Sequence, residues 1–165
     1  MEQNQKLQEV EHLARKLMNE FGLLEKRWKF QFNTRKNALG VCSRQLFKGK
    51  SIQLSKPWML KLPMEQVERV IRHEIAHALA PAHEGHGRIW KEMCCVVGIP
   101  DETRCFEDKV ISKEFRKETA KWKQECPTCG RVKYKHKRKY TPQSCGVCSG
   151  SSYKEEHKLK WSLNE

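Results

Sequence analysis

The segment His73-Glu74-Ile75-Ala76-His77 holds two imidazoles and a carboxylate at a spacing that can build a hydrolytic zinc site. Residues four apart lie on the same face of an α-helix, so His73 and His77 can direct nitrogen atoms at one metal ion. Glu74, beside the first histidine, can then take a proton from a water molecule at that ion. The pattern predicts a zinc metallopeptidase with Glu74 as its catalytic base.

A catalytic zinc ion usually has three protein ligands and keeps its fourth position open. His83 and His86 follow the motif and could each supply the third ligand. His83 has the spacing of another zinc peptidase pattern, but Ala80 stands where that pattern needs a glycine. Gly85 and Gly87 allow a sharp turn around His86 before the apolar residues of a new helix. The sequence therefore favours His86, with His83 as the alternative.

A second metal site is predicted by two C-x-x-C pairs separated by fifteen residues. This spacing is typical of a zinc ribbon, in which four thiolates hold one structural zinc ion. The predicted ligands are Cys126, Cys129, Cys145 and Cys148. A redox dithiol or two disulfides would need a thioredoxin-like strand context or an oxidising compartment. Of the other cysteines, we expect Cys94 and Cys95 to lie in the core, since they belong to an apolar run.

The segment between the two cysteine pairs is basic and contains tyrosines. Cations on an exposed hairpin would bind phosphates, and tyrosine rings can stack on unpaired bases. The candidate nucleic-acid-binding residues are Arg131, Lys133, Tyr134, Lys135, Lys137, Arg138, Lys139 and Tyr140. A solvated charged hairpin without a ligand is the alternative.

The whole chain is also basic, with 33 Lys and Arg against 20 Asp and Glu and a formal charge of +13. Such a charge attracts polyanions, so DNA, including single-stranded DNA, is the first partner to consider, and ribosomal or acidic-protein binding would look similar. The polar N-terminus lacks the pattern of a secretory signal, and no segment reaches the length of a membrane span. We expect a soluble, intracellular monomer in the cytoplasm, nucleoid or nucleus, without membrane association.

The elements that must position these residues indicate an α+β fold. Apolar residues at helical spacing from Leu7 to Phe21 predict an N-terminal helix that ends at Gly22. Alternation over 28–33, and shorter runs at 38–42 and 52–54, predict three strands of one short antiparallel sheet. The motif helix should begin at Pro63 and end near Ala80, and a further helix should follow His86.

These patterns divide the chain into three parts. Residues 1–122 would form a zincin-like core with a charged, partly helical connector from Asp101 to Lys123, which includes Val110, Ile111 and Phe115. Residues 123–153 would form the basic zinc ribbon, and residues 154–165 a charged tail.

Several motifs together resemble the SprT-like family, which includes the Spartan proteases that act on DNA-protein crosslinks. They are LGVC at 39–42, IQLS at 52–55, HEIAHAL at 73–79, EGHGRIW at 84–90 and the cysteine ribbon, and the resemblance covers residues 7–150. It implies a gluzincin-like core in which His73, His77 and His86 bind catalytic zinc and Glu74 is the general base. It also implies a role in DNA repair, with the basic C-terminal region on DNA.

The leading hypothesis is therefore a DNA-dependent zinc metalloendopeptidase that cleaves DNA-bound or DNA-crosslinked proteins and holds one catalytic and one structural Zn²⁺. The first alternative is a non-catalytic DNA-binding protein with a structural zinc at the histidines. Glu74 argues against it, since a structural site has no use for a general base. The second alternative is a general peptidase that is independent of DNA.

Overall fold

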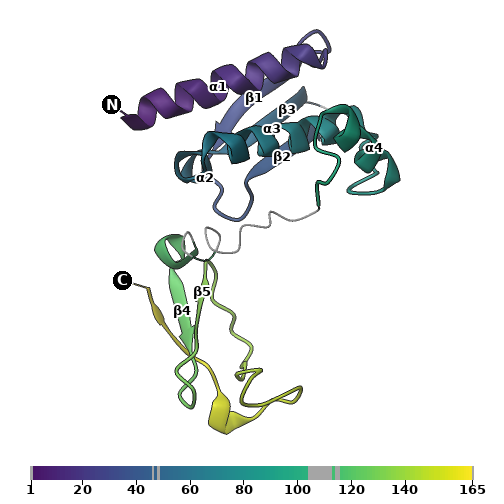
Figure 1. The fold of residues 1–165 in the computed structure, drawn as a ribbon. Helices are drawn as coiled ribbons and strands as arrows, with labels where there is room; N and C mark the ends of the chain where they lie inside the picture. The colour runs from purple at the N-terminus through teal and green to yellow at the C-terminus, as the bar shows by residue number, and fades with distance from the viewer. Residues whose placement is uncertain (1, 46, 48, 104–112, 114–115, 165) are drawn as a thin grey trace. The chain divides into compact units, whose positions relative to one another are not determined.

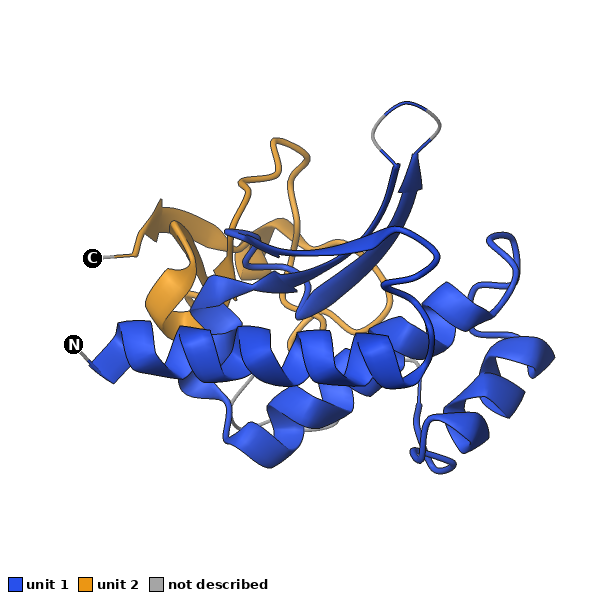
Figure 2. Ribbon diagram, turned by 90° about the horizontal axis from the view of Figure 1, so that it is seen from above, with its two compact units in different colours: residues 1–105 blue, residues 106–165 orange. Residues whose placement is uncertain are grey.

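The chain divides into two compact units, residues 1–105 and residues 106–165 (Figure 2). The computed structural model describes residues 2–45, 47, 49–103, 113 and 116–164. The expected helical character of the connector at Val110, Ile111 and Phe115 falls outside these residues. Within the described part of the chain, no helix has the length and apolar character needed to cross a membrane.

The first unit contains four helices and three strands among its described residues (Figure 1). They are α1 (Glu2–Glu20), β1 (Trp28–Asn33), β2 (Gly40–Gln45), β3 (Gly49–Ser55), α2 (Lys56–Lys61), α3 (Met64–Leu79) and α4 (Arg88–Val96). The predicted N-terminal helix, motif helix and following helix correspond to α1, α3 and α4. The short helix α2 was not predicted.

The sheet of the first unit is mixed, which corrects the expectation of an antiparallel sheet. Its strand order is β1-β3-β2. β2 and β3 form an antiparallel hairpin, whereas β1 runs parallel to β3 with Phe30 opposite Ile52. Alternation along a strand reports which side chains share a face and carries no information on strand direction. The connection from β1 therefore crosses to the far edge of the sheet before the chain returns along the centre.

Helices α1 and α3 cover the same face of this sheet. They contact each other, and α1 also contacts β1 while α3 contacts β2 and β3. The core between the layers contains Val10, Leu17, Phe30, Ile52 and Ile75, all buried. Because α3 packs on the edge strand β2, side chains of β2 lie beside the zinc motif.

The second unit is a three-stranded antiparallel sheet of order β5-β4-β6. Its elements are β4 (Trp122–Glu125), β5 (Val132–Lys135), a 3₁₀ turn η1 (Glu155–His157) and β6 (Lys160–Leu163). Strand β6 corrects the expected charged tail at 154–165, since Trp161 lies opposite Gln124 and the segment completes the sheet. The segment was predicted as a tail because it is charged, and its short strand-like alternation at Lys160–Leu163 was overlooked.

Candidate active site

Helix α3 presents the histidine motif on the rim of its buried face. Val67, Ile71 and Ile75 are fully buried, whereas His73 and His77 keep part of their surface exposed. This arrangement follows from the sequence, because the apolar residues repeat at helical spacing and the histidines flank that stripe. The helix ends at Leu79, where Pro81 cannot continue it.

A tight turn after α3 brings His86 back to the motif. Gly85 has φ +58, a conformation that favours glycine, and Gly87 lies against Glu84 so closely that a Cβ there would be 2.3 Å from its carboxylate. The same carboxylate accepts a hydrogen bond of 2.9 Å from the backbone N–H of Ile89 in the first turn of α4. Glu84 thus caps α4 and fixes the loop that carries His86.

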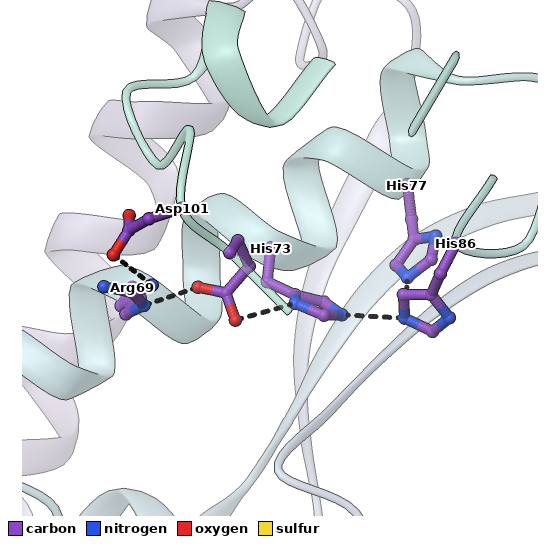
Figure 3. Close-up of polar contacts among 6 residues, drawn as sticks. Arg69, His73, His77, His86 and Asp101 are labelled. Atoms are coloured by element: carbon purple, nitrogen blue, oxygen red, sulfur yellow. Dashed lines mark hydrogen bonds and ion pairs between the residues drawn. The ribbon is translucent and has the colours of Figure 1, made fainter. Parts of the chain in front are cut away.

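Three imidazole nitrogens converge at this place (Figure 3). Nε2 of His86 lies 3.1 Å from Nε2 of His77 and 3.3 Å from Nε2 of His73. Two nitrogen ligands of a tetrahedral zinc ion are about 3.4 Å apart, given Zn–N bonds of about 2.1 Å. The cluster therefore fits a zinc ion. His83 is exposed and does not belong to it.

The indole of Trp90 forms the floor under the histidines. Its ring centroid lies 5.0 Å from that of His73, 5.3 Å from that of His77 and 4.6 Å from that of His86. Trp90 is fully buried. The sequence predicted it only as part of the apolar face of a helix, and its contact with all three histidines is a tertiary feature.

Glu74 points from α3 toward the edge strand β2. It is 6% exposed, and the backbone N–H of Cys42 donates a hydrogen bond to its carboxylate. A Cβ on Gly40 would lie only 2.6 Å from Oε1 of Glu74 and 2.7 Å from its Cγ. Glycine at position 40 is therefore what allows the carboxylate to lie against the strand. No pattern in the sequence predicted a role for Gly40.

Burial adjusts the proton affinities around the motif. Desolvation raises the pKa of Glu74 to about 7, against the opposing influences of the His73 charge and the Cys42 N–H. Desolvation, with the charges of His73, His86 and Arg44, lowers the pKa of His77 to about 4. His77 is thus a neutral imidazole near pH 7, with a lone pair free for a metal. Burial and Glu74 raise the pKa of the Cys42 thiol to about 12, so this cysteine stays protonated.

Arg44 connects β2 to the end of α3. Its Nη2 donates hydrogen bonds to the carbonyl oxygens of His77, Ala78 and Ala80 at 2.9, 2.9 and 2.7 Å. Its guanidinium also lies over the Trp28 ring, 5.2 Å from the centroid. These carbonyls have no partner within the helix, and a cation is favourable at a helix C-terminus. Arg44 therefore anchors the backbone that carries His77.

An open hollow of about 540 Å³ borders the histidine cluster on the side of α4. Its lining comprises His86, Gly87, Arg88, Lys91, Glu92, Cys95 and Pro100. Cys95 is exposed there, which corrects its expected place in the core, whereas Cys94 is buried as expected.

The four cysteines of the second unit also form one cluster. Sγ of Cys126 lies 3.9 Å from that of Cys148, and Sγ of Cys129 lies 3.8 Å from that of Cys145. Two thiolate ligands of a tetrahedral zinc ion are about 3.8 Å apart, given Zn–S bonds of about 2.3 Å. Backbone N–H groups of Cys148 and Val147 lower the pKa of Cys145 to about 6, which favours the thiolate that binds metal.

The basic segment is only partly a strand. β5 covers residues 132–135, and seven of the eight candidate nucleic-acid-binding residues are exposed, Tyr134 being half-buried. Trp122 and Trp161, for which no role was predicted, share a face of this sheet with Lys133 and Lys135. Trp122 pairs with Lys135, and Gln124, two residues after Trp122 and so on the same face, pairs with both Lys133 and Trp161. The Arg138 guanidinium lies 5.5 Å from the Trp122 ring centroid.

Comparison with known families matches residues 7–109, more than half of the chain, to the SprT-like family. No curated protein matches the chain. The matched segment contains the whole histidine cluster, together with Gly40, Glu74 and Trp90.

Proposed function

Because the chain belongs to the SprT-like family, we propose that it is a zinc-dependent metalloendopeptidase whose active site is formed by His73, Glu74, His77 and His86. The observation that carries the proposal is the convergence of three histidine Nε2 atoms beside a buried carboxylate. Among the described residues this cluster offers three ligands, which leaves a position for water or substrate.

The protein residues divide the work between them. His73, His77 and His86 hold the ion, and Glu74 accepts and returns a proton. Zinc bound there would lower the pKa of water and polarise a peptide carbonyl. Glu74 is suited to proton transfer because Cys42 and Gly40 fix its position and burial raises its pKa above the usual range of a carboxyl group. It takes a proton from the attacking water and passes it to the leaving amine.

The decisive variant is Glu74→Gln, which keeps the three metal ligands and removes the base. Cleavage of a basic DNA-binding protein by the zinc-loaded chain should fall below detection in this variant, with the zinc content unchanged. The control for a Glu-to-Gln change is Glu20→Gln, because Glu20 is exposed. Glu84 is unsuitable for this purpose, since its carboxylate caps α4. Full cleavage by the Glu74→Gln variant would exclude this site as the source of activity.

We further propose that cleavage depends on DNA and acts on proteins bound or crosslinked to it. The support is the charge of the ribbon unit, in which the nine consecutive positions 131–139 contain no acidic residue and six cationic ones: Arg131, Lys133, Lys135, Lys137, Arg138 and Lys139. Exposed cations of this density bind phosphates, and the nearby Trp122 and Trp161 rings offer surfaces for base stacking. Holding DNA there would raise the concentration of a DNA-bound substrate around the protease.

The test compares cleavage with and without single-stranded DNA and measures DNA affinity by fluorescence anisotropy against salt. The double variant Lys133→Gln, Lys135→Gln should weaken binding and lower the magnitude of the log-log salt slope by about 0.7 per lost phosphate contact. Lys16→Gln, Lys26→Gln removes two exposed charges of the first unit as a matched control. Cleavage that is indifferent to DNA would favour a general peptidase, and binding without cleavage would favour a non-catalytic DNA-binding protein.

A further inference from the structure

Glu102 lies beyond the end of α4, outside the histidine motif, yet its carboxylate faces one of the histidines. Its Oε1 lies 3.6 Å from Nδ1 of His73, the ring nitrogen that does not take part in the Nε2 cluster. The Glu102 side chain is only 9% exposed. This contact is therefore shielded from water, and a small rotation would shorten it to a hydrogen bond.

Two neighbours hold Glu102 in this place. Its Oε2 accepts a hydrogen bond of 2.5 Å from Nε of Arg69, which lies one turn before His73 on α3. The other branch of Arg69 reaches Asp101 at 3.2 Å, and the Glu102 backbone N–H donates to the carbonyl of Ile99 at 3.0 Å. Figure 3 shows this row of contacts: Asp101 and the Glu102 carboxylate both meet Arg69, the carboxylate also faces His73, and the row continues to the other histidines. Glu102 is thus clamped between α3 and its own turn.

The charge of Glu102 decides what it can do to His73. Its Oε2 forms an ion pair with Nε of Arg69 at 2.5 Å, and a neighbouring guanidinium favours the ionised form of a carboxyl group. An ionised carboxylate can only accept hydrogen bonds. The imidazole nitrogen that faces it must then carry the proton, which leaves the lone pair on Nε2. Carboxylates in this position orient metal-binding histidines and raise their basicity.

We propose that Glu102, clamped by Arg69, is a positioning residue that fixes His73 with its proton on Nδ1 and its Nε2 lone pair directed at the zinc ion. The inference rests on the proposed zinc site. It adds two residues outside the H-E-x-x-H segment to the centre, and one of them, Glu102, comes from a different part of the chain.

The test uses the full chain and the variant Glu102→Gln, which keeps the size of the side chain and removes its charge. Zinc affinity is measured by competition with a chelator of known affinity, followed through the side-chain ¹⁵N–¹H NMR signals of His73, His77 and His86. These signals report the histidine site and not the cysteine site. Asp101→Asn is the matched control, because Asp101 contacts the same arginine, is 74% exposed and lies outside the His73 contact.

We expect Glu102→Gln to weaken zinc binding at the histidine site by roughly 10- to 100-fold. The NMR signals of His73 in the metal-free variant should also show a larger share of the tautomer with the proton on Nε2. A general loss of stability would not change that tautomer. Asp101→Asn should retain the wild-type affinity and tautomer.

If Glu102→Gln has the zinc affinity and the His73 tautomer of the unmodified chain, the positioning role of Glu102 is overturned, whereas the proposed peptidase function is unaffected. If zinc does not shift the histidine signals of the unmodified chain, both the proposed function and the clamp fail. If the Glu102→Gln chain is too unstable for NMR, Arg69→Lys takes its place. This variant holds Glu102 less firmly and should also weaken zinc binding. Unchanged zinc affinity in Arg69→Lys would overturn the proposed positioning role of Glu102.

Discussion

The proton affinity of Glu74 depends on a single environment, the space between α3 and the edge strand β2. Desolvation there raises its pKa from 4.5 to about 7, so the metal-free folded chain keeps a proton that the unfolded chain loses between these values. The unfolded state binds fewer protons in this window, and the free energy of unfolding therefore falls as pH rises through it. Above pH 7 the full penalty of a buried carboxylate is present.

We predict that Glu74→Gln stabilises the metal-free chain above pH 7, by an amount on the order of 3 kcal/mol at 1.36 kcal/mol per pKa unit, and changes little below pH 4.5. His77 acts in the opposite direction, because its pKa is lowered to about 4 and stability is lost as pH falls from 6.5 toward that value. Denaturant unfolding of both chains at several pH values isolates the Glu74 contribution as their difference. A difference that does not vary with pH would contradict the raised pKa.

Gly40 matters for the space that it leaves. A methyl group there would lie 2.6 Å from Oε1 and 2.7 Å from Cγ of Glu74, so the whole carboxyl group must move. We predict that Gly40→Ala lowers kcat by about 100-fold, since a displacement of about 1 Å is enough for such a loss. Zinc affinity should be unchanged, because the three atoms nearest to that methyl group all belong to Glu74 and not to a histidine. Gly146→Ala, where a Cβ meets open space, is the control, and equal activity of the two variants would refute the proposed role.

At the scale of elements, α4 supports the metal site through Trp90. Replacing a buried Trp by Ala costs about 3 to 5 kcal/mol, and here the cavity would open directly under the three histidines. We predict that Trp90→Ala loses zinc at the histidine site as well as stability. Trp90→Phe should retain most of both, because the indole N–H has no hydrogen-bond partner within the described part of the chain. Calorimetry measures the stability of each variant, and metal analysis measures its zinc content. If Trp90→Phe loses as much zinc as Trp90→Ala, a packing role for Trp90 is contradicted.

Strand β2 supports the same site from the other side through Arg44. We predict that Arg44→Met lowers the free energy of unfolding by about 1 kcal/mol, a value reduced for the exposure of this side chain, and weakens zinc binding through His77. Arg44→Lys should recover only part of the loss, since an ammonium group lacks the planar guanidinium that lies over the Trp28 ring. Arg15→Met, which breaks an exposed ion pair on α1, serves as the comparison. The idea fails if Arg44→Met and Arg15→Met have the same zinc affinity.

At the scale of the whole molecule, the two units should respond differently to metal loss. The second unit has a small sheet and a four-cysteine cluster, and a unit of this size depends on its metal to fold. We predict that Cys145→Ser unfolds residues 122–163 and abolishes DNA binding, while the first unit keeps its fold and cleaves short peptides. Hydrogen exchange resolved along the chain measures both units at once. Cys95→Ser is the control, because Cys95 is exposed and lies outside the four-cysteine cluster. If the amides of the second unit stay protected from exchange in Cys145→Ser, the prediction is wrong.

Local patterns in the sequence determined the features that depend on neighbours along the chain. The helical spacing of apolar residues from Leu7 to Phe21 and around His73 predicted α1 and α3, and the glycines beside His86 predicted the turn that returns it to the motif. The spacing of the two C-x-x-C pairs predicted the cysteine cluster. The same motifs pointed to the SprT-like family, and the comparison with known families confirms it. In each case residues a few positions apart meet because helix or turn geometry brings them together.

Only the tertiary structure decided which distant residues complete the site. The parallel pairing of β1 and β3 left β2 at the edge, so that Gly40 and Arg44 lie against α3, and the turn after α4 placed Glu102 beside His73. It also folded the C-terminal segment into the second sheet as β6. These contacts join residues that lie 22 or more positions apart in the chain. Periodicity reports which face a residue occupies, and only the packing of one element on another determines what that face meets.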